Sequence, residues 1–170
     1  MSERSMIPKH LLPNPEGLLA FAAHKAAVSM ENHLNEALIN VGITVLHWNI
    51  LFRCLKFDYF EETKIAKTIL VTEESAQKAI KDLIEKDLIE RVKDSNNPKG
   101  NLLVLTKSGM DLIPQIMPIL MRNIGIFRDG IDPEDVITTI NVLNKICHNL
   151  QPEETLYQLE TPPKYIEVEN

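Results

Sequence analysis

The sequence predicts a mainly α-helical domain of the α+β class with one small β-hairpin. Apolar residues recur at spacings of three and four over most of the chain, which is the period of an amphipathic helix. The period changes to two only between residues 88 and 105, on either side of a run of turn residues at 94–100. Apolar residues make up 44% of the 170 positions, which is enough to build a hydrophobic core.

The first third is expected to hold an arm and two helices. Residues 1–16 are rich in proline and are predicted to form an extended arm. A helix predicted over 17–39 is apolar around much of its girth, which is typical of a helix buried on several sides by its own domain or by a partner. Gly42 ends this pattern, and Thr44 can cap a second helix over about 44–56.

The middle third is predicted to form two short helices and a β-hairpin. Residues 58–60 are expected to be a loop, and Glu62 and its acidic neighbours a solvated surface. Thr72 follows a tight connection and can cap the second short helix. The predicted elements are helices over 61–69 and about 73–86 and strands over 88–92 and 101–105, with a long polar turn between the strands.

The last third is predicted to hold two more helices and a tail. The first helix, over 107–127, contains Pro114 and Pro118, which favour a kink or a late start. Asp132 is an N-cap residue directly before a proline at the first helical position, which is a strong start for a helix over 133–150. Residues 151–170 are acidic and rich in proline, and we expect a loosely held tail.

The net charge of −6 conceals a neutral middle third. Residues 61–110 carry nine Lys+Arg and nine Asp+Glu, whereas residues 111–170 carry four and ten. Since an acidic balance does not favour nucleic acid, any nucleic-acid surface must be local. Two cysteines cannot form a disulfide framework, no apolar run approaches the roughly 18 residues of a membrane span, and no signal peptide is visible. These observations predict a soluble cytoplasmic protein without membrane contact.

The order of the central elements is that of a winged helix-turn-helix. Two short helices joined by a tight turn are followed at once by a hairpin. In this arrangement the second helix enters the major groove of DNA, the first crosses the backbone, and the hairpin forms a wing near the phosphates or the minor groove. The predicted core of the winged helix covers about 41–109.

Several short motifs occur in this core in an order typical of one family. Thr63-Lys-Ile-Ala-Lys67 is similar to a third-helix pattern t-x-L-A, and Leu105-Thr-Lys-Ser-Gly109 is similar to L-T-x-x-G. Residues 83–91 are similar to L-E-K-K-G-L-I-x-R, with Asp87 in place of the glycine. On these motifs the chain resembles the MarR/SlyA class of bacterial winged-helix transcription regulators.

The resemblance implies a homodimer that binds a pseudo-palindromic operator in double-stranded DNA through two recognition helices and two wings. It implies a single domain over 17–150, in which the helices at 17–39 and 107–150 form a dimerisation lobe. It also implies, in many members, a small-molecule effector or an oxidant that changes the spacing of the two DNA-reading surfaces.

The DNA-contacting positions of the family carry over in part. A glutamine can read adenine, and a lysine can contact phosphate or guanine. The wing pattern D-x-R-D-x-R of the family is replaced by Asp94-Ser-Asn-Asn-Pro-Lys99, so that Asn96 stands in place of the first arginine. The candidate DNA-binding residues are Thr72, Ser75, Gln77, Lys78 and Lys81 on the second short helix, and Lys93, Asn96, Asn97 and Lys99 on the hairpin.

Glu73 and Glu74, at the start of the recognition helix, are a second departure from the family. Acidic residues in a first turn favour the helix dipole, but here they can also repel phosphate or accept a hydrogen bond from cytosine. Together with the missing wing arginine they support a rival hypothesis. In that hypothesis the chain is a protein-interaction module that keeps the fold and binds DNA weakly or not at all.

The remaining candidates are given other roles. Trp48, Phe52 and Met117 are the candidate lining of an apolar effector pocket between the first, second and fifth helices. No His, Cys and Asp cluster has metal-ligand spacing, so no metal or cofactor is predicted. Because no local catalytic motif is visible either, an enzyme is not expected.

Structural roles are predicted for an arginine and the two cysteines. Arg91 is expected to brace the base of the wing, with Asp94 as a candidate partner. Cys54 and Cys147 are most simply interpreted as small buried apolar residues.

Overall fold

The computed structural model of the chain describes residues 15–93 and 100–150. These residues fall into two compact units, one ending at Phe127 and one beginning at Arg128, and each is described by itself. Most of the predicted arm, the hairpin tip and the acidic tail lie outside the described residues. The assignment of residues 17–150 to one domain stays a prediction.

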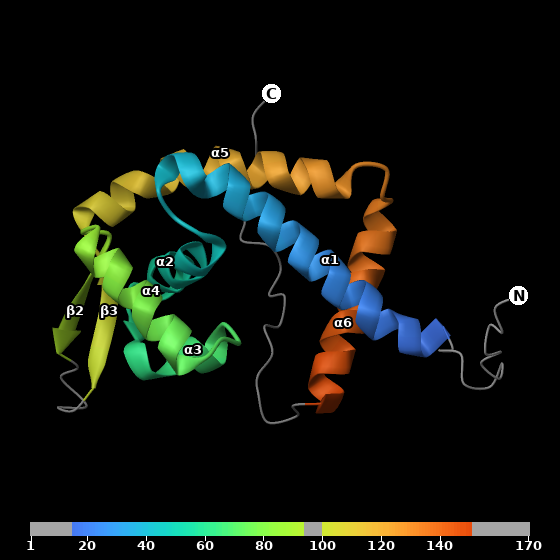
Figure 1. Cartoon of the computed structure of the whole chain (residues 1–170), viewed down its shortest axis with the longest axis horizontal. Helices are drawn as coiled ribbons and strands as arrows, with labels where there is room; N and C mark the ends of the chain where they lie inside the picture. The colour runs from blue at the N-terminus through green and yellow to red at the C-terminus, as the bar shows by residue number, and fades with distance from the viewer. Residues whose placement is uncertain (1–14, 94–99, 151–170) are drawn as a thin grey trace, which may run out of the picture. The chain divides into compact units, whose positions relative to one another are not determined.

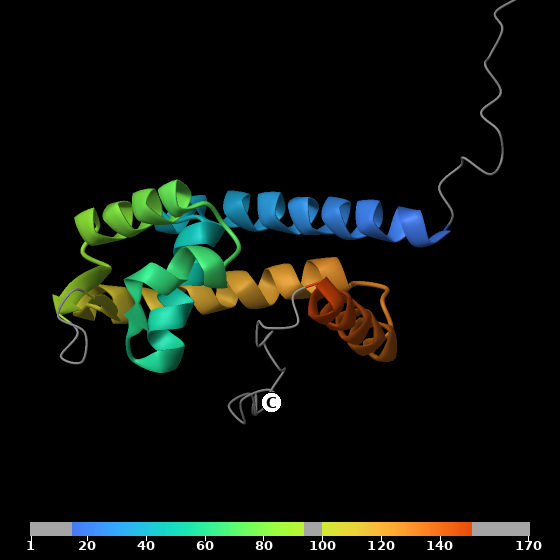
Figure 2. The ribbon, with the colours of Figure 1, turned by 90° about the horizontal axis from the view of Figure 1, so that it is seen from below.

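The first unit begins with a long helix that is exposed over most of its length. α1 (Pro15–Leu38) is one uninterrupted helix in both views of the ribbon (Figures 1 and 2), and η2 (Ile39–Val41) follows it as a 3-10 turn. Phe21 is 65% exposed, whereas Leu38 at the other end is fully buried. Only the last turns of α1 therefore contribute to the core of this unit.

α2 (Val45–Phe57) begins with a reciprocal pair of hydrogen bonds. Thr44 Oγ1 accepts from the backbone N–H of His47 at 3.3 Å, and the backbone N–H of Thr44 donates to His47 Nδ1 at 3.1 Å. This is a capping box in which histidine takes the place of the usual Glu or Gln. The predicted cap at Thr44 is confirmed, and it fixes the ring of His47 at the start of the helix.

The two short helices follow with the predicted tight connection. η3 (Glu62–Lys64) leads into α3 (Ile65–Thr68), so the first helix begins as a 3-10 turn, and α4 (Glu73–Glu85) is the longer second helix. Leu70 adopts a positive φ of 57°, which turns the chain sharply between them. The predicted helix pair is confirmed.

The strands form one antiparallel sheet in the order β1-β3-β2 within the described residues. β2 (Ile89–Lys93) and β3 (Asn101–Leu105) are the predicted hairpin, paired from Ile89 with Leu105 to Lys93 with Asn101. The expected loop at 58–60 is wrong at its last residue, because β1 (Phe60–Glu61) pairs with β3. A strand of two residues is too short to show a periodic pattern in the sequence. It forms because β3 has a free edge with which it can pair.

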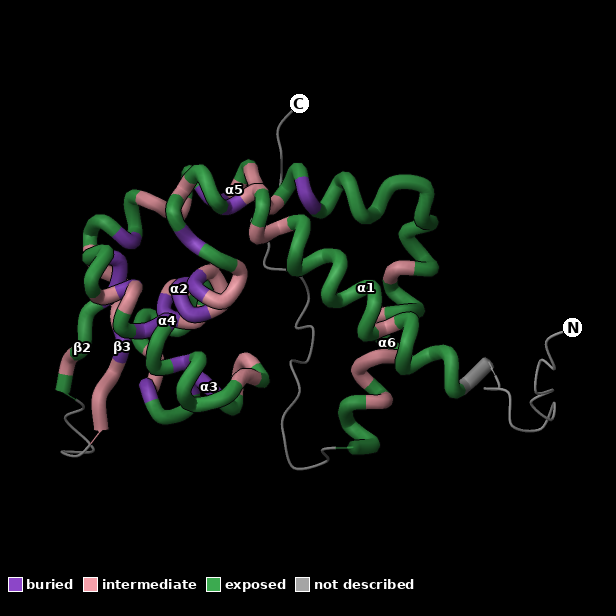
Figure 3. Tube along the Cα trace, in the orientation of Figure 1, coloured by how far each residue is buried: buried purple, intermediate pink, exposed green. Residues whose placement is uncertain are grey.

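The core of the first unit lies where α2, α3, α4 and the sheet meet (Figure 3). Apolar side chains at helical spacing on α2 and α4 fill most of it, together with inward-facing residues of the strands and a few residues of α1, α3 and α5. The fully buried ones of largest size are Leu38, Ile50, Leu51, Ile65, Ile80, Leu83, Ile89, Leu103, Ile116 and Cys54. Cys54 is buried as expected, and burial raises the pKa of its thiol to about 11. Cys147, in the second unit, is exposed, so its prediction as a buried residue is wrong.

α5 (Lys107–Arg128) continues through both of its prolines. The alternative of a late start is wrong, since the helix begins at Lys107, before Pro114 and Pro118. Both prolines are exposed, whereas Ile116 on the opposite side is fully buried. The carbonyl groups that lose a hydrogen bond to proline can therefore bond to water, and packing of the apolar face holds the helix.

A compact corner joins the hairpin to α5. Asp87, with a positive φ of 56°, occupies a conformation that glycine adopts more easily. Its backbone carbonyl accepts from Thr106 Oγ1 at 2.5 Å, and its carboxylate accepts from Ser108 Oγ at 2.8 Å. A Cβ on Gly109 would overlap the carbonyl oxygen of Leu88. Thr106 Oγ1 also accepts from the backbone N–H of Gly109 at 3.0 Å, which caps α5. The T-x-x-G part of the motif is thus explained by this cap and by the close backbone approach at Gly109.

The second unit contains one described helix, α6 (Pro133–Leu150). Asp132 Oδ1 accepts from the backbone N–H of Glu134 at 2.9 Å, which confirms the predicted start. No residue of α6 is buried in this chain, and apolar side chains such as Ile137, at 59%, are well exposed. The apolar face of α6 therefore lacks a covering layer among the described residues.

No single helix among the described residues is both long and apolar enough to cross a membrane. Gly17–Val41 and Val45–Phe57 reach that length and composition only as a pair, and a bend of 77° separates them.

Candidate nucleic-acid interface

α4 has one buried face and one exposed face. Ala76, Ala79, Ile80 and Leu83 are buried in the core. The predicted DNA-contacting side chains of this helix lie between them on the exposed face: Ser75, Gln77, Lys78 and Lys81. The spacing that buries one set therefore presents the other set together, as a helix that enters a groove requires.

Thr72 and Ser75 are already engaged with each other at the start of α4. Thr72 Oγ1 accepts from the backbone N–H of Ser75 at 3.2 Å and donates to Ser75 Oγ at 2.9 Å. Both residues are exposed. The cap fixes the two hydroxyl groups at the end of the helix, where Ser75 Oγ can still donate to a phosphate oxygen.

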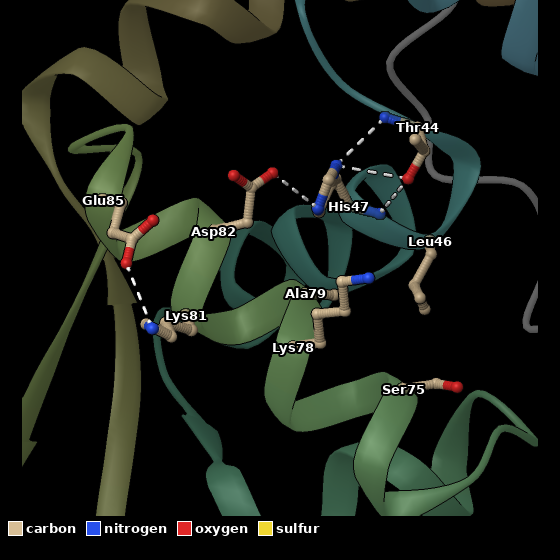
Figure 4. A pocket seen from close by; sticks show the side chains of 9 residues that line it. All are labelled: Thr44, Leu46, His47, Ser75, Lys78, Ala79, Lys81, Asp82 and Glu85. Carbon is tan, nitrogen blue, oxygen red and sulfur yellow. Dashed lines mark hydrogen bonds and ion pairs between the residues drawn. The ribbon is translucent and has the colours of Figure 1, made fainter.

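A hollow of about 540 Å³ lies between the start of α2 and the exposed side of α4 (Figure 4). Lys78 and Lys81 both line it, and Lys81 Nζ lies 3.6 Å from Glu85 Oε1. An exposed pair at this spacing contributes little, since such pairs are worth about 0.3–0.5 kcal/mol. Lys81 can therefore exchange Glu85 for a phosphate at small cost.

His47 connects α2 to α4 across this hollow (Figure 4). Its Nδ1 accepts from the Thr44 backbone, so the neutral ring carries its proton on Nε2, which lies 3.2 Å from Asp82 Oδ2. Burial lowers the pKa of His47 although the charge of Asp82 opposes this, and the charge of Lys86 lowers it further. The neutral imidazole thus donates to a carboxylate at neutral pH.

Asp82 is held in its charged form by a second partner. Lys86 Nζ donates to Asp82 Oδ1 at 2.6 Å. This hydrogen bond, together with the charges of Lys86 and Lys78 and of His47 once acid protonates it, outweighs partial burial and lowers the pKa of Asp82. Asp82 therefore remains an anion beside the two lysines of the exposed face, which reduces the positive potential there.

A buried carboxylate lies at the base of the wing. Glu62 is 7% exposed, and its Oε1 and Oε2 accept from Arg91 Nη2 at 2.7 Å and from Arg91 Nε at 2.8 Å. Asn101 Nδ2 donates to Oε2 at 3.1 Å, and Lys93 Nζ donates to Asn101 Oδ1 at 3.1 Å. The expectation that Glu62 belongs to a solvated surface is wrong, because its side chain is buried and Arg91 and Asn101 of the two hairpin strands donate hydrogen bonds to its carboxylate.

Electrostatics keeps this pair charged. Burial raises the pKa of Glu62, but hydrogen bonds from Arg91 and Asn101, the Arg91 charge and a weaker hydrogen bond from Gln77 together lower it below its ordinary value. The hydrogen bond to Glu62 in turn raises the pKa of Arg91. The prediction that Arg91 braces the wing base is confirmed, with Glu62 as its partner; Asp94 lies outside the described residues.

The hairpin candidates are only partly described. Lys93 stands at the end of β2, exposed and opposite Asn101. Asn96, Asn97 and Lys99 lie outside the described residues. The contacts of all these residues with DNA stay predictions.

The candidate effector pocket is also untested. Trp48 and Phe52 pack as a tilted aromatic pair with ring centroids 5.7 Å apart, and Met117 is half-buried. A second hollow, of about 440 Å³, lies between the end of α1 and α5 and is lined by other residues, among them His33 and Asn123. An effector pocket at Trp48, Phe52 and Met117 stays a prediction.

Two features of the site, the roles of Glu62 and His47, could not be predicted from the sequence. Glu62 stands among other acidic residues, and nothing local distinguishes it from them. His47 gave only the weak signal of standing three residues after a capping threonine. Both acquire partners from far along the chain, 29 residues away for Glu62 and Arg91.

Comparisons with known proteins identify the fold. No family profile matches the sequence, and no curated protein matches it significantly. Among solved structures, a MarR family transcriptional regulator from Streptomyces coelicolor in complex with DNA is 20% identical, with a TM-score of 0.74, over 85% of this chain and 97% of that one. AbsC, another from the same organism, is 19% identical, with a TM-score of 0.72, over 83% and 98%.

A mutant of MarR from E. coli complexed with operator DNA is also similar. It is 20% identical, with a TM-score of 0.69, over 75% of this chain and 92% of that one. At such identities the comparison establishes architecture. The chain therefore has the winged-helix fold of the MarR-family transcriptional regulators.

Proposed function

We propose that the protein is a cytoplasmic, sequence-specific DNA-binding transcription regulator. The observation that carries this proposal is the exposed face of α4, which presents Gln77, Lys78 and Lys81 beside a braced hairpin. The structural neighbours include two solved with DNA, and in a winged helix this face is the one that meets the major groove. Gln77 would contact base edges, and Lys78, Lys81 and Lys93 would contact phosphates.

The proposed regulator acts as a homodimer. The support is the number of large apolar side chains that are exposed along three helices, which a monomeric protein seldom leaves uncovered. They include Leu18, Phe21 and Met30 on α1, Ile124, Ile126 and Phe127 on α5, and Ile137, Val142 and Leu150 on α6. A two-fold dimer would bind a pseudo-palindromic operator.

Fluorescence anisotropy on labelled DNA tests DNA binding. The probe is genomic DNA from around the gene of the protein itself, with random DNA as competitor, at low and moderate salt. Lys78, Lys81 and Lys93 give three phosphate contacts per protomer and six per dimer. The logarithm of the binding constant should then fall with the logarithm of salt concentration with a slope of about −5.4. Selective binding with a steep slope supports the proposal, and binding without preference contradicts sequence specificity.

Sedimentation equilibrium tests the dimer. Phe21→Glu should shift the protein toward monomer, because it places a charge on the apolar face of α1. Tyr59→Glu is the matched control, an aromatic residue of similar exposure (55% against 65%) outside the three helices. A wild-type protein that stays monomeric at micromolar concentration would contradict this part of the proposal.

A small apolar effector is the remaining part of the proposal. The Trp48–Phe52 pair supplies an aromatic surface, and Trp48 is the single tryptophan of the chain. Energy transfer from Trp48 to the apolar dye ANS would report occupancy, and Phe52→Ala should weaken it. Equal transfer in both proteins would place the dye elsewhere.

A protein-interaction module with weak or no DNA affinity is the second candidate. It is favoured by Glu73 and Glu74, which are exposed in the first turn of α4 where phosphates would come close. The anisotropy experiment separates the two functions. Absence of binding at low salt, with a stoichiometric protein partner in a pulldown, would support the module.

A further inference from the structure

Glu62 is a buried charged residue that lies behind the proposed DNA-binding face of α4 and contacts it through Gln77. It lies in η3, before the helix pair, and its partners come from both strands of the hairpin. An ionised carboxylate is costly to bury unless it is fully hydrogen-bonded. Three donors from Arg91 and Asn101 meet this need, and Gln77 of α4 supplies a weaker hydrogen bond. An apolar residue would fill the same space, so the charge calls for another explanation.

The explanation lies in the direction of the hydrogen bonds. An ionised carboxylate only accepts, so Asn101 must turn its amide nitrogen toward Glu62. The amide oxygen of Asn101 then faces the opposite way, toward the ammonium of Lys93 at 3.1 Å. Lys93 stands opposite Asn101 in the sheet. The carboxylate of Glu62 thus fixes the orientation of the Asn101 amide, whose oxygen holds the exposed ammonium of Lys93.

We propose that Glu62 is a positioning residue of the DNA interface, which places Lys93 through Asn101 and clamps β2 through Arg91. The inference rests on the proposed function and deepens it, since it names a residue that DNA does not touch but on which binding depends. The partner remains the phosphate backbone, which Lys93 meets from the end of β2.

If Glu62 acted only through its charge, its removal would have the opposite effect on DNA binding. Removal of an acid near a DNA-binding surface raises the local positive potential and should strengthen binding. If Glu62 matters through its hydrogen bonds, Glu62→Gln should weaken binding in spite of the gained charge. The sign of the change therefore separates the two accounts.

Glu61→Gln is the matched control. Glu61 is the adjacent residue, it also pairs with a cation, Lys64 at 2.6 Å, and its side chain is 41% exposed. Both substitutions remove one negative charge at neighbouring positions. We expect several-fold weaker binding for Glu62→Gln and equal or slightly stronger binding for Glu61→Gln, by anisotropy at moderate salt. Equal changes in the two variants would overturn the inference.

A double-mutant cycle shows whether Glu62 acts through Lys93. Lys93→Ala removes two phosphate contacts per dimer and should reduce the salt slope by about 1.8. In the Glu62→Gln background the same substitution should have little further effect, because Lys93 is already displaced. Fully additive effects would mean that the two residues act independently, and the inference would fail.

Asn101→Ala covers the case in which Glu62→Gln does not fold. It breaks the relay to Lys93 and leaves the pair of Glu62 with Arg91 in place. It should reproduce the reduced salt slope in a protein with an unchanged circular dichroism spectrum, and an unchanged slope would overturn the inference. Wild-type protein that binds no DNA would overturn the proposed function and this inference together, whereas the results above overturn the inference alone.

Discussion

Gly109→Ala should destabilise the protein through one close contact. A Cβ at this position would overlap the carbonyl oxygen of Leu88 and lie 3.1 Å from its carbonyl carbon and 3.2 Å from Leu105 Cδ2. The first two atoms belong to backbone, so α5 and the start of β2 would have to separate. Overpacking costs about 1–3 kcal/mol or more, and rigid backbone favours the upper end. The higher helix propensity of alanine offsets about 1 kcal/mol of this cost, so the free energy of unfolding should fall by about 2 kcal/mol.

Gly125→Ala is the control for this prediction, in the same helix. Nothing lies within 4 Å of a Cβ at this position, so only the propensity gain remains. For a chain of this size the expected shifts in melting temperature are about 4–8 °C downward for Gly109→Ala and about 2–4 °C upward for Gly125→Ala. Thermal unfolding followed by circular dichroism measures both. If Gly109→Ala were as stable as Gly125→Ala, the explanation of the L-T-x-x-G motif by close packing would be refuted.

Two further predictions concern His47 and Lys78. Because burial lowers the pKa of His47, the unfolded chain binds a proton first on acidification, so the free energy of unfolding should fall as the pH drops below about 6.5. Urea titrations at several pH values should show this slope, at most about 1.4 kcal/mol per pH unit for one proton, and His47→Gln should abolish it; an equal slope in the variant would exclude His47 as its source. Lys78→Ala should reduce the salt slope of DNA binding by about 1.8 without loss of stability, whereas Lys107→Ala, at the other end of β3 from the hairpin tip, should leave the slope unchanged. An unaltered slope for Lys78→Ala would remove this residue from the interface.

The parts of the fold that follow from local chemistry could be predicted from the sequence. Thr44 and Thr72 each cap a helix, because the side-chain oxygen accepts a hydrogen bond from the backbone N–H three residues later. This contact involves no other part of the chain. The hairpin followed from the change of period and the concentrated turn residues, and its register places Lys93 opposite Asn101. The exposed face of α4 followed from the helical spacing of its buried residues.

Three of the errors, at Phe60, Cys147 and Glu62, concern contacts between distant segments. Phe60 becomes a strand residue only because β3, about forty residues later, offers a free edge. Cys147 lies on an apolar helix face for which this chain provides no cover among its described residues. The burial of Glu62 depends on Arg91 and Asn101, and no periodicity of an acidic segment can indicate it.

Asp87 and Glu62 show how this chain departs from a family pattern without losing the fold. Asp87 stands where the similar motif has glycine, and the left-handed conformation costs an L-residue about 1 kcal/mol relative to glycine. Its carboxylate, however, accepts from Ser108 at the start of α5, a bond that glycine cannot make and that is worth a similar amount. At the other end of the hairpin, Glu62 and Arg91 brace the base of a wing whose first family arginine is replaced by Asn96. A chain with fewer cations on its wing depends more strongly on the exact position of those that remain. The buried carboxylate of Glu62 orients the amide of Asn101, and Asn101 in turn accepts a hydrogen bond from Lys93 and fixes its position.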